Sequence, residues 1–277
     1  MPELPEVETT CAGIRPAILN NQISSLVIRN YNFRWPIAPE LPVLIQDMKV
    51  HEVYRRAKYI VLLLSQGSLI LHLGMSGSLR VLDSNIPLKK HDHIDINFID
   101  GTCLRLNDPR RFGAVIYTTE PIDQHKLFQH LGPEPLSQSF DAEYLTSYCR
   151  IKNQNIKSVI MNAQIVVGVG NIYANEALFL AGIHPETPAK SLTTKQASDL
   201  CNQIKLVLIT AIKQGGTTLK DFSSPDGKPG YFSQQLKVYG RKGLPCVNCQ
   251  TLLQEVRIQN RSTVFCAACQ RQQSENN

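Results

Sequence analysis

Residues 59–73 read Tyr-Ile-Val-Leu-Leu-Leu-Ser-Gln-Gly-Ser-Leu-Ile-Leu-His-Leu, and this stretch decides the fold of the N-terminal half. Two apolar runs, Tyr59–Leu64 and Ser68–Leu73, flank the turn pair Gln66-Gly67, a pattern typical of a β-hairpin. The next segments repeat the pattern. Ile94, Ile96 and Phe98 alternate with polar residues before an Asp100-Gly101 turn, and Gly113–Thr118 forms a further strand. Short strands separated by turns, from about residue 24 to 118, predict a β-sandwich or barrel.

Helical patterns lie on both sides of this β region. Residues 3–20 predict a short N-terminal helix whose first-turn glutamates suit the positive end of the helix dipole. The Pro/Gly-rich stretch His130–Leu136 reads as a linker, and the clearest helix runs from Thr194 to Gln214. Thr193 with Gln196 forms a capping box at its start, and Gly215-Gly216 stops it. We therefore predict an α+β protein.

Composition narrows the class of protein. The chain has 277 residues, 43% of them hydrophobic and 19% charged, which is typical of a globular protein rather than a disordered one. Its longest apolar run, Ile60–Leu64, is too short to span a bilayer, and no secretory signal is visible, so we expect a cytoplasmic protein without a membrane partner. The net charge is +6, and the segment Lys237–Gln273 carries six basic residues against one acid. Such a basic segment weakly favours a phosphate-rich partner.

Four of the eight cysteines form a metal-binding pattern. Cys246 and Cys249 make one Cys-x2-Cys pair, Cys266 and Cys269 make a second, and sixteen residues separate the two pairs. Four thiolates with this spacing can converge tetrahedrally on one Zn²⁺, and a four-cysteine site is closed, so we expect one structural zinc ion. The remaining four (Cys11, Cys103, Cys149 and Cys201) are scattered, and we expect them to be buried packing residues.

The segment between the cysteine pairs predicts a β-hairpin finger. Strand-like segments around Leu252–Val256 and Thr263–Phe265 flank Gln259-Asn-Arg-Ser262, which places Arg261 near the turn. An arginine there fits either a solvated turn or a contact with DNA, and the residues alone leave both interpretations open.

The N-terminus carries possible catalytic chemistry. If the initiator methionine is removed, Pro2 becomes a secondary amine, and a free α-amine has a pKa of about 7.7 to 8.0, so part of it is nucleophilic at cellular pH. Attack of a secondary amine on a sugar C1′ gives an iminium ion, which acidifies the neighbouring C2′–H and promotes elimination of the 3′ phosphate. Glu3 beside it could give or take a proton. The same Pro-Glu pair is also a good start for a helix.

Many motifs along the chain resemble one known family. They are Pro2-Glu-Leu-Pro-Glu-Val-Glu-Thr9, Arg56-Ala-Lys-Tyr59, His72-Leu-Gly-Met-Ser-Gly77, Lys90-His-Asp-His93, Asp108-Pro-Arg-Arg-Phe-Gly113, Val167-Gly-Val-Gly-Asn-Ile-Tyr173, Gln214-Gly-Gly-Thr-Thr-Leu-Lys-Asp-Phe222, Asp226-Gly-Lys-Pro-Gly-Tyr-Phe232 and Val238-Tyr-Gly-Arg241. With the four cysteines, they resemble the bacterial formamidopyrimidine-DNA glycosylase family over nearly the whole chain.

The resemblance implies an enzyme of base-excision repair. It would remove oxidised purines (8-oxoguanine and formamidopyrimidines) from damaged double-stranded DNA and then nick the abasic strand by β,δ-elimination. Pro2 would be the Schiff-base nucleophile and Glu3 the general acid. Lys58 would assist β-elimination, and Arg261 would assist δ-elimination as it contacts the phosphate beside the lesion. Without the resemblance, Lys58 could be an edge-strand gatekeeper.

The resemblance also implies a set of DNA contacts. A base in a duplex must be flipped out before it can be excised, and the resulting gap must be filled. Met75, Arg110 and Phe112 resemble the inserted triad of the family. Without the resemblance, Met75 and Phe112 would more often be core residues, and Arg110 would more often be a surface charge. His91, Asn153, Lys157 and Asn171 would hold phosphates. The loop 215–232 resembles the lid over the flipped base.

The implied architecture has three parts. They are a catalytic β-sandwich domain with an N-terminal helix (1–133), a helix–two-turn–helix domain (134–234) and a four-cysteine zinc finger (235–271). A monomeric, nucleoid-associated bacterial enzyme would follow. Two positions depart from the family pattern: Asn162, where relatives commonly have aspartate, and Asn153, where some have lysine. Both changes could weaken phosphate affinity or its salt dependence.

Two alternatives remain. The first is a sister enzyme that acts on oxidised pyrimidines, such as endonuclease VIII, which has the same fold. Leu4 and the Asp108–Phe112 motif favour the purine enzyme instead. A zinc-finger DNA-binding protein without catalysis would be expected to have lost Pro2, Glu3 or Lys58, and all three are present.

Overall fold

The computed structural model describes residues 2–217 and 235–271, so the predicted lid loop lies almost entirely outside the described residues. The chain divides into two compact units. The first combines residues 1–129 with 212–233, and the second combines residues 130–211 with 234–277. No helix in the described ranges is long and apolar enough to cross a membrane.

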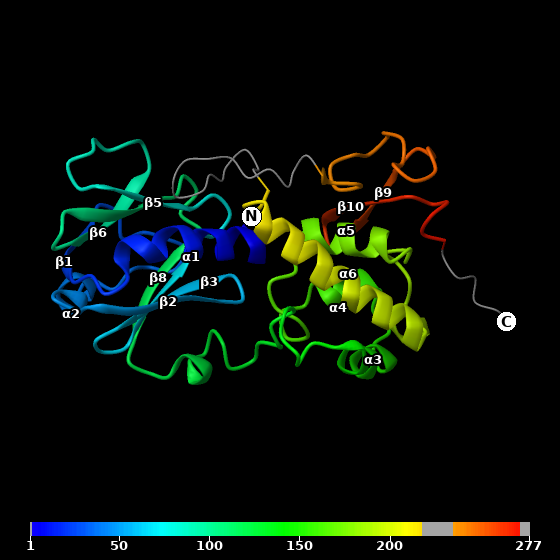
Figure 1. Cartoon of the computed structure of the whole chain (residues 1–277), viewed down its shortest axis with the longest axis horizontal. Coiled ribbons are helices and arrows are strands. Elements are labelled where there is room, and N and C mark those ends of the chain that lie inside the picture. The colour runs from blue at the N-terminus through cyan, green and yellow to red at the C-terminus, as the bar shows by residue number, and fades with distance from the viewer. Residues whose placement is uncertain (1, 218–234, 272–277) are drawn as a thin grey trace. The chain divides into compact units, whose positions relative to one another are not determined.

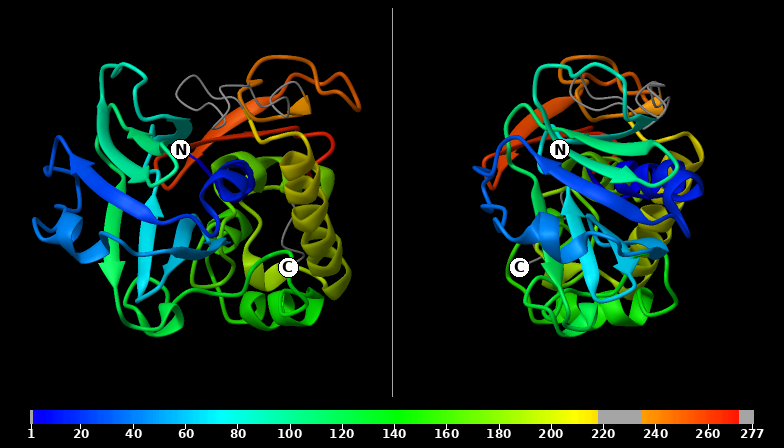
Figure 2. Two further views of the ribbon diagram at one scale, coloured as in Figure 1. Left: turned by 60° about the vertical axis from the view of Figure 1, so that its left-hand side comes forward. Right: turned by 90° about the vertical axis from the view of Figure 1, so that its left-hand side faces the viewer.

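The first unit is a β-sandwich with a helix at its start, as Figures 1 and 2 show. Helix α1 (Leu4–Ile18) is followed by two antiparallel four-stranded sheets. One sheet has the order β1 (Ile23–Ile28), β6 (Asp92–Phe98), β7 (Thr102–Asn107) and β5 (Ser78–Asp83). The other has the order β2 (Val50–Arg56), β3 (Tyr59–Leu64), β4 (Ser68–His72) and β8 (Ala114–Thr118). A short helix α2 (Leu41–Ile45) follows β1.

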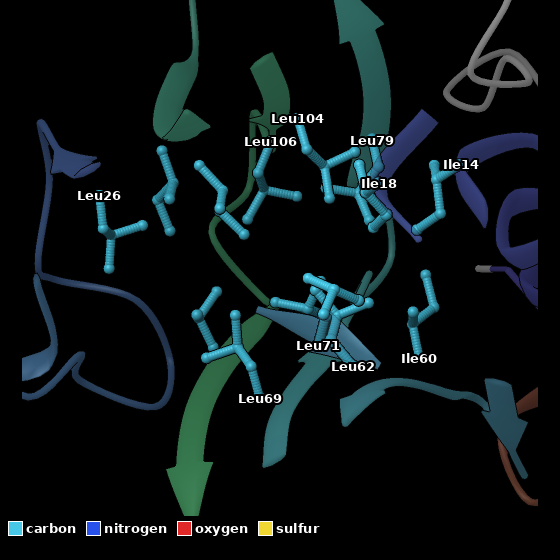
Figure 3. Close-up of a cluster of buried hydrophobic side chains, with 14 of the residues drawn as sticks. Ile14, Ile18, Leu26, Ile60, Leu62, Leu69, Leu71, Leu79, Leu104 and Leu106 are labelled. Carbon is cyan, nitrogen blue, oxygen red and sulfur yellow. The ribbon is translucent and has the colours of Figure 1, made fainter. Parts of the chain in front are cut away.

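The core of this unit lies between the two sheets. In Figure 3, Leu79 and Leu104 of one sheet face Leu62 and Leu71 of the other, and Ile14 of α1 lies beside them. These side chains are at most 3% exposed. The period-2 apolar pattern that predicted the strands is therefore also the pattern that fills the core.

Three charged residues of β6 and β7, Asp92, Asp95 and Arg105, are buried as well, which the alternating pattern did not predict. Arg105 is 2% exposed, and its guanidinium donates to Asp95 through Nε (2.8 Å) and Nη2 (3.0 Å) and to the carbonyl of Ile86 (2.8 Å). Arg29 donates to Asp95 (2.6 Å), and Arg80 pairs with Asp92. The arginines hold the pKa of Asp95 below its ordinary value by hydrogen bonds and charge, against the effect of desolvation.

The second unit contains the remaining helices and the finger. Its elements are α3 (Ala142–Arg150), α4 (Ile156–Ile160), α5 (Asn171–Leu180), α6 (Thr194–Lys213), β9 (Gln254–Ile258) and β10 (Arg261–Phe265). The last two residues of α6 belong to the first unit. Short 3₁₀ turns span Ile122–Gln124 in the first unit and Ala189–Ser191 in the second. The capping box predicted for α6 is present, since Gln196 N–H donates to Thr193 Oγ1 and Thr193 N–H donates to Gln196 Oε1. The predicted apolar face of α6 is buried, and the fold is α+β as expected.

Candidate functional site

The first residues of the chain are buried at the start of α1. Glu3 is the N-cap and is 3% exposed, and it forms a reciprocal capping box with Glu6. Glu6 is 1% exposed. Its Oε2 accepts from Glu3 N–H (2.8 Å), and its Oε1 accepts from the N–H (2.8 Å) and hydroxyl (2.9 Å) of Thr217. Pro2 is buried directly before this box. The helix start therefore fixes the position of the residue predicted to carry the nucleophilic amine.

Gly216 is required next to Glu6. Its φ is +78°, and a Cβ atom there would lie 3.0 Å from Glu6 Oε1. Both the left-handed backbone and the close approach favour glycine, because a side chain would displace the carboxylate. The Gly-Gly pair after α6 thus does more than end the helix: it brings the Thr217 backbone to Glu6.

Lys58 lies in the two-residue turn between β2 and β3, where Arg56 pairs with Tyr59 across the hairpin. The turn is tight, since Ala57 has a φ of +56°. Arg55 supports it by donating to the Ala57 carbonyl (3.0 Å) and to Glu8 Oε2 of α1 (2.7 Å). The Lys58 position is therefore tied to α1, the helix that begins just after Pro2.

His72, the last residue of β4, is a half-buried imidazole. Burial, together with the nearby charge of Lys58, lowers the pKa of His72 to about 4. The neutral ring accepts from Gly74 N–H through Nδ1 (3.2 Å), and its centroid lies 4.8 Å from that of Tyr59. Both rings line a pocket of about 90 Å³ together with Arg34, Trp35 and Phe112.

The predicted inserted triad lies on two loops of the first unit. Met75 is 38% exposed on the loop after β4, and Arg110 and Phe112 lie on the loop after β7. The guanidinium carbon of Arg110 lies 4.7 Å from the Phe112 ring centroid, which is cation–π distance. His91, a predicted phosphate contact, is half-buried directly before β6 with a φ of +72°. The structure places Met75 and Phe112 at the surface or half-buried, outside the sandwich core.

In the second unit, Lys157 and Asn171 hold the finger hairpin. Lys157 is fully buried, and its Nζ donates to Asn171 Oδ1 (2.6 Å), Thr263 Oγ1 (2.6 Å) and the Ser262 carbonyl (3.3 Å). Asn171, the first residue of α5, also donates to the Ser262 carbonyl (2.9 Å). Arg261 is exposed at the start of β10, one residue before this contact. The phosphate contacts predicted for Lys157 and Asn171 stay predictions, as does that of Asn153, which is exposed ahead of α4.

The sequence patterns did not identify two residues that have clear structural roles, Asn175 and Glu176. Asn175 is 2% exposed on α5; its Oδ1 accepts from Val264 N–H (2.9 Å) and its Nδ2 donates to the Asn171 carbonyl (2.6 Å). Glu176 accepts the N–H groups of Lys237, Val238 and Tyr239 (2.8–3.0 Å), while burial raises its pKa. Val264 lies 89 residues from Asn175, and Lys237 lies 61 residues from Glu176, so no local pattern marks these two roles.

The four predicted zinc ligands converge. Their sulfur atoms lie within 4.8 Å of one another, with separations of 3.4 Å (Cys249–Cys266), 3.5 Å (Cys249–Cys269) and 3.9 Å (Cys246–Cys269). Zn–S bonds of about 2.3 Å at tetrahedral angles would place sulfurs about 3.8 Å apart. The donor set and its geometry therefore fit one zinc ion. The other four cysteines are buried, as expected, and burial raises the pKa of Cys11 to about 12.

Comparison with known families covers most of the chain. Residues 1–115 match the formamidopyrimidine-DNA glycosylase N-terminal domain, and residues 131–223 match the formamidopyrimidine-DNA glycosylase H2TH domain. The chain belongs to the formamidopyrimidine-DNA glycosylase family. It is a DNA glycosylase, and the resemblance stated from its motifs is confirmed. Residues 243–272 match the zinc finger found in FPG and IleRS, so the four-cysteine site is a zinc site.

Individual relatives agree over nearly full length. The chain is 54% identical to a formamidopyrimidine-DNA glycosylase of Hydrogenovibrio crunogenus (98% of this chain, 97% of the relative) and 53% identical to one of Shewanella amazonensis (98% and 99%). The crystal structure of the MutM (Fpg) protein of Thermus thermophilus superposes with a TM-score of 0.88 at 35% identity (99% and 100%). A Lactococcus lactis Fpg mutant in complex with Fapy-dG-containing DNA gives 0.89 at 31% identity (98% and 100%).

Proposed function

We propose that this glycosylase removes oxidised purines, 8-oxoguanine and formamidopyrimidines, from duplex DNA, and that it cleaves the abasic strand in the same active site. The observation that carries the proposal is the buried start of the chain, where Pro2 precedes the Glu3–Glu6 capping box. Related Lactococcus lactis proteins were crystallised with Fapy-dG-containing DNA and with DNA that contains an abasic site, which supports both the lesion class and the second step.

In the proposed mechanism, the Pro2 amine attacks C1′ of the damaged nucleotide, and the C1′–N bond breaks as the base leaves. Glu3 donates a proton that opens the deoxyribose ring, which gives an iminium ion on Pro2. Removal of a C2′ proton then expels the 3′ phosphate by β-elimination, and a second elimination expels the 5′ phosphate. This mechanism needs a free Pro2 amine, and therefore removal of Met1.

Lys58 and Arg261 serve the elimination steps in this proposal. The tie from Arg55 to the Ala57 carbonyl supports a defined position for Lys58 in its turn. The contacts of Lys157 and Asn171 with the finger support a defined position for Arg261, which we propose contacts the phosphate beside the lesion. Met75, Arg110 and Phe112 fill the gap left by the flipped base, and His91, Asn153, Lys157 and Asn171 contribute to phosphate binding.

The remaining expectations are part of the same proposal. We propose three parts (1–133, 134–234 and 235–271), a monomer, and an enzyme of the bacterial cytoplasm associated with the nucleoid. Its partner is damaged double-stranded DNA.

The deciding experiment is borohydride trapping. Protein shown by intact mass spectrometry to lack Met1 is mixed with an 8-oxoguanine:cytosine duplex and sodium borohydride. We expect a covalent adduct that is lost in Pro2→Ala, whereas Pro5→Ala, three residues along in α1, retains it. An intact, methionine-free protein that forms no adduct would disprove the mechanism.

One observation favours a second substrate class. A Lactococcus lactis Fpg was also crystallised with DNA that contains an oxidised pyrimidine. Single-turnover rates on 8-oxoguanine:cytosine and thymine glycol duplexes separate the two assignments. Faster action on thymine glycol would replace the purine assignment by the pyrimidine one.

A further inference from the structure

Asp108 is a fully buried carboxylate that joins the two loops of the predicted triad. It is 0% exposed, and its Oδ1 accepts from the Ser76 hydroxyl (2.9 Å) on the loop after β4. Its Oδ2 accepts from Gly113 N–H (2.9 Å) on its own loop. Arg110 N–H lies 3.3 Å from both Asp108 Oδ1 and Ser76 Oγ. One carboxylate therefore connects residues of both loops.

The two loops also touch backbone to backbone. A Cβ atom on Gly74 would lie 2.4 Å from the Phe112 carbonyl carbon and 2.6 Å from Gly113 N, and a Cβ on Gly113 would lie 2.7 Å from the His72 carbonyl oxygen. No side chain can be inserted at these contacts without moving one loop. The loops therefore form one rigid element, and a displacement of either is transmitted to the other.

Each side chain of the triad lies at or beside an anchored residue. Met75 precedes Ser76, Phe112 precedes Gly113, and Arg110 is held through its own N–H. Unstacking a base step costs a few kcal/mol, so a wedge that opens DNA must resist being pushed back. A rigid base beneath three partly exposed side chains meets that requirement.

The contacts need a carboxylate specifically. An ionised aspartate accepts with both oxygens, whereas an asparagine presents one oxygen and one NH₂ group. In either orientation of an asparagine, the NH₂ group would face a backbone N–H, that of Gly113 at the Oδ2 position or that of Arg110 at the Oδ1 position. Asp108→Asn keeps the size of the side chain and disrupts the junction of the loops.

We propose that Asp108 is the positioning residue of the wedge: it preorganises Met75, Arg110 and Phe112 for insertion into DNA and takes no part in bond breaking at C1′. This inference rests on the proposed function, because it assumes that the triad is inserted into duplex DNA. Its consequence is a selective defect. Loss of the carboxylate slows opening of a duplex and spares chemistry on a sugar that is already accessible.

The test compares two DNA substrates and three variants. Asp108→Asn breaks the junction, and Ser76→Ala removes only its link to the Met75 loop. Asp100→Asn is the matched control. Asp100 is exposed at the other end of β7, about 25 Å along the chain, and its carboxylate likewise accepts a backbone N–H, that of Thr102. One substrate is a duplex with 8-oxoguanine opposite cytosine and 2-aminopurine beside the lesion. The other is a single strand with a preformed abasic site, which has no base to evict and no gap to fill.

On the duplex, we expect Asp108→Asn to slow the 2-aminopurine rise and single-turnover excision about tenfold or more, the size typical of losing a hydrogen bond to a charged group. Ser76→Ala should show a smaller effect of the same kind. Borohydride adduct formation on the single-stranded abasic site should stay within about twofold of wild type for both, and Asp100→Asn should match wild type throughout.

Other outcomes overturn the proposal. Equal losses on both substrates would make Asp108 a residue of general stability, and a normal 2-aminopurine rise in both Asp108→Asn and Ser76→Ala would show that the junction does not position the wedge. Failure of the proposed function gives a different result, namely no adduct with wild-type protein. The fluorescence comparison still decides the role of Asp108 in that case, because it follows DNA opening and needs no chemistry.

Discussion

Acidification below pH 6.5 should destabilise the first unit through His72. The ring has an ordinary pKa of 6.5, and burial lowers the pKa to about 4 in the folded protein. Because the folded pKa is the lower one, the unfolded chain takes up a proton first as the pH falls, and the folded state loses stability between pH 6.5 and 4. Above pH 6.5 the ring is neutral in both states and contributes no pH dependence.

The size of the effect follows from the shift. One pKa unit corresponds to about 1.4 kcal/mol, so the full shift amounts to roughly 3 kcal/mol, of which about 2.5 kcal/mol is lost by pH 4.5. Other groups titrate in the same range. The comparison must therefore be made with a variant that removes His72 alone. His72→Asn is suitable, since the Asn amide oxygen can take the place of Nδ1 as acceptor for Gly74 N–H and does not titrate.

The assay is urea unfolding at pH 7.0, 6.0, 5.0 and 4.5, followed by tryptophan fluorescence. Trp35, the only tryptophan in the sequence, lines the same pocket as His72 and reports on this unit. We expect wild type and the exposed-site control His51→Asn to lose about 2.5 kcal/mol more than His72→Asn between pH 7.0 and 4.5. If all three proteins lose stability in parallel, the neutral, desolvated ring of His72 is the wrong explanation.

Three further predictions concern two buried contacts and the zinc site. Arg105→Met should lower the free energy of unfolding by about 3–5 kcal/mol in urea, because it leaves the buried carboxylate of Asp95 with the half-exposed Arg29 as its remaining arginine partner. Conversely, a variant as stable as wild type would show that the pair contributes no net stability. Asn175→Ala should cost about 1–3 kcal/mol, because Val264 N–H loses its acceptor. It should also reduce strand cleavage, because Arg261 lies on the hairpin that Asn175 holds. Unchanged cleavage would show that the position of Arg261 does not depend on this contact. Removal of zinc by a chelator should release one metal ion per chain, measured with a chromogenic indicator, and should abolish binding to lesion DNA. Binding that survives complete release would contradict this.

Local patterns predicted much of the secondary structure. Tyr59–Leu64 was predicted with the bounds that β3 has, because an apolar run and a Gly turn carry enough local information. The predicted face of α6 is buried as well, because a long amphipathic helix has few alternative ways to pack. The first strand of the finger hairpin begins and ends two residues later than predicted. The reason is the position of its turn, Gln259-Asn260, where both residues have positive φ.

Contacts between distant residues could not be predicted in the same way. The burial of Arg105 depends on Asp95 across the sheet, and that of Lys157 depends on Thr263, 106 residues further along the chain. A lysine or arginine in a sequence indicates a surface position unless its partner is known. The zinc cysteines were predictable because four ligands in two close pairs need no knowledge of the fold. The role of Asp108 appears only once both loops are placed.

The contact between Glu6 and Thr217 has a consequence for how the protein is made. The two residues are 211 positions apart, yet both belong to the first unit, whose sequence is interrupted by residues 130–211. At a synthesis rate of about 5–20 residues per second, roughly 10–40 s pass between their emergence from the ribosome. During that interval the nascent sandwich lacks the segment around Thr217, which supplies hydrogen bonds to Glu6. The proposed catalytic centre is therefore assembled late, after the helices of the second unit have been translated.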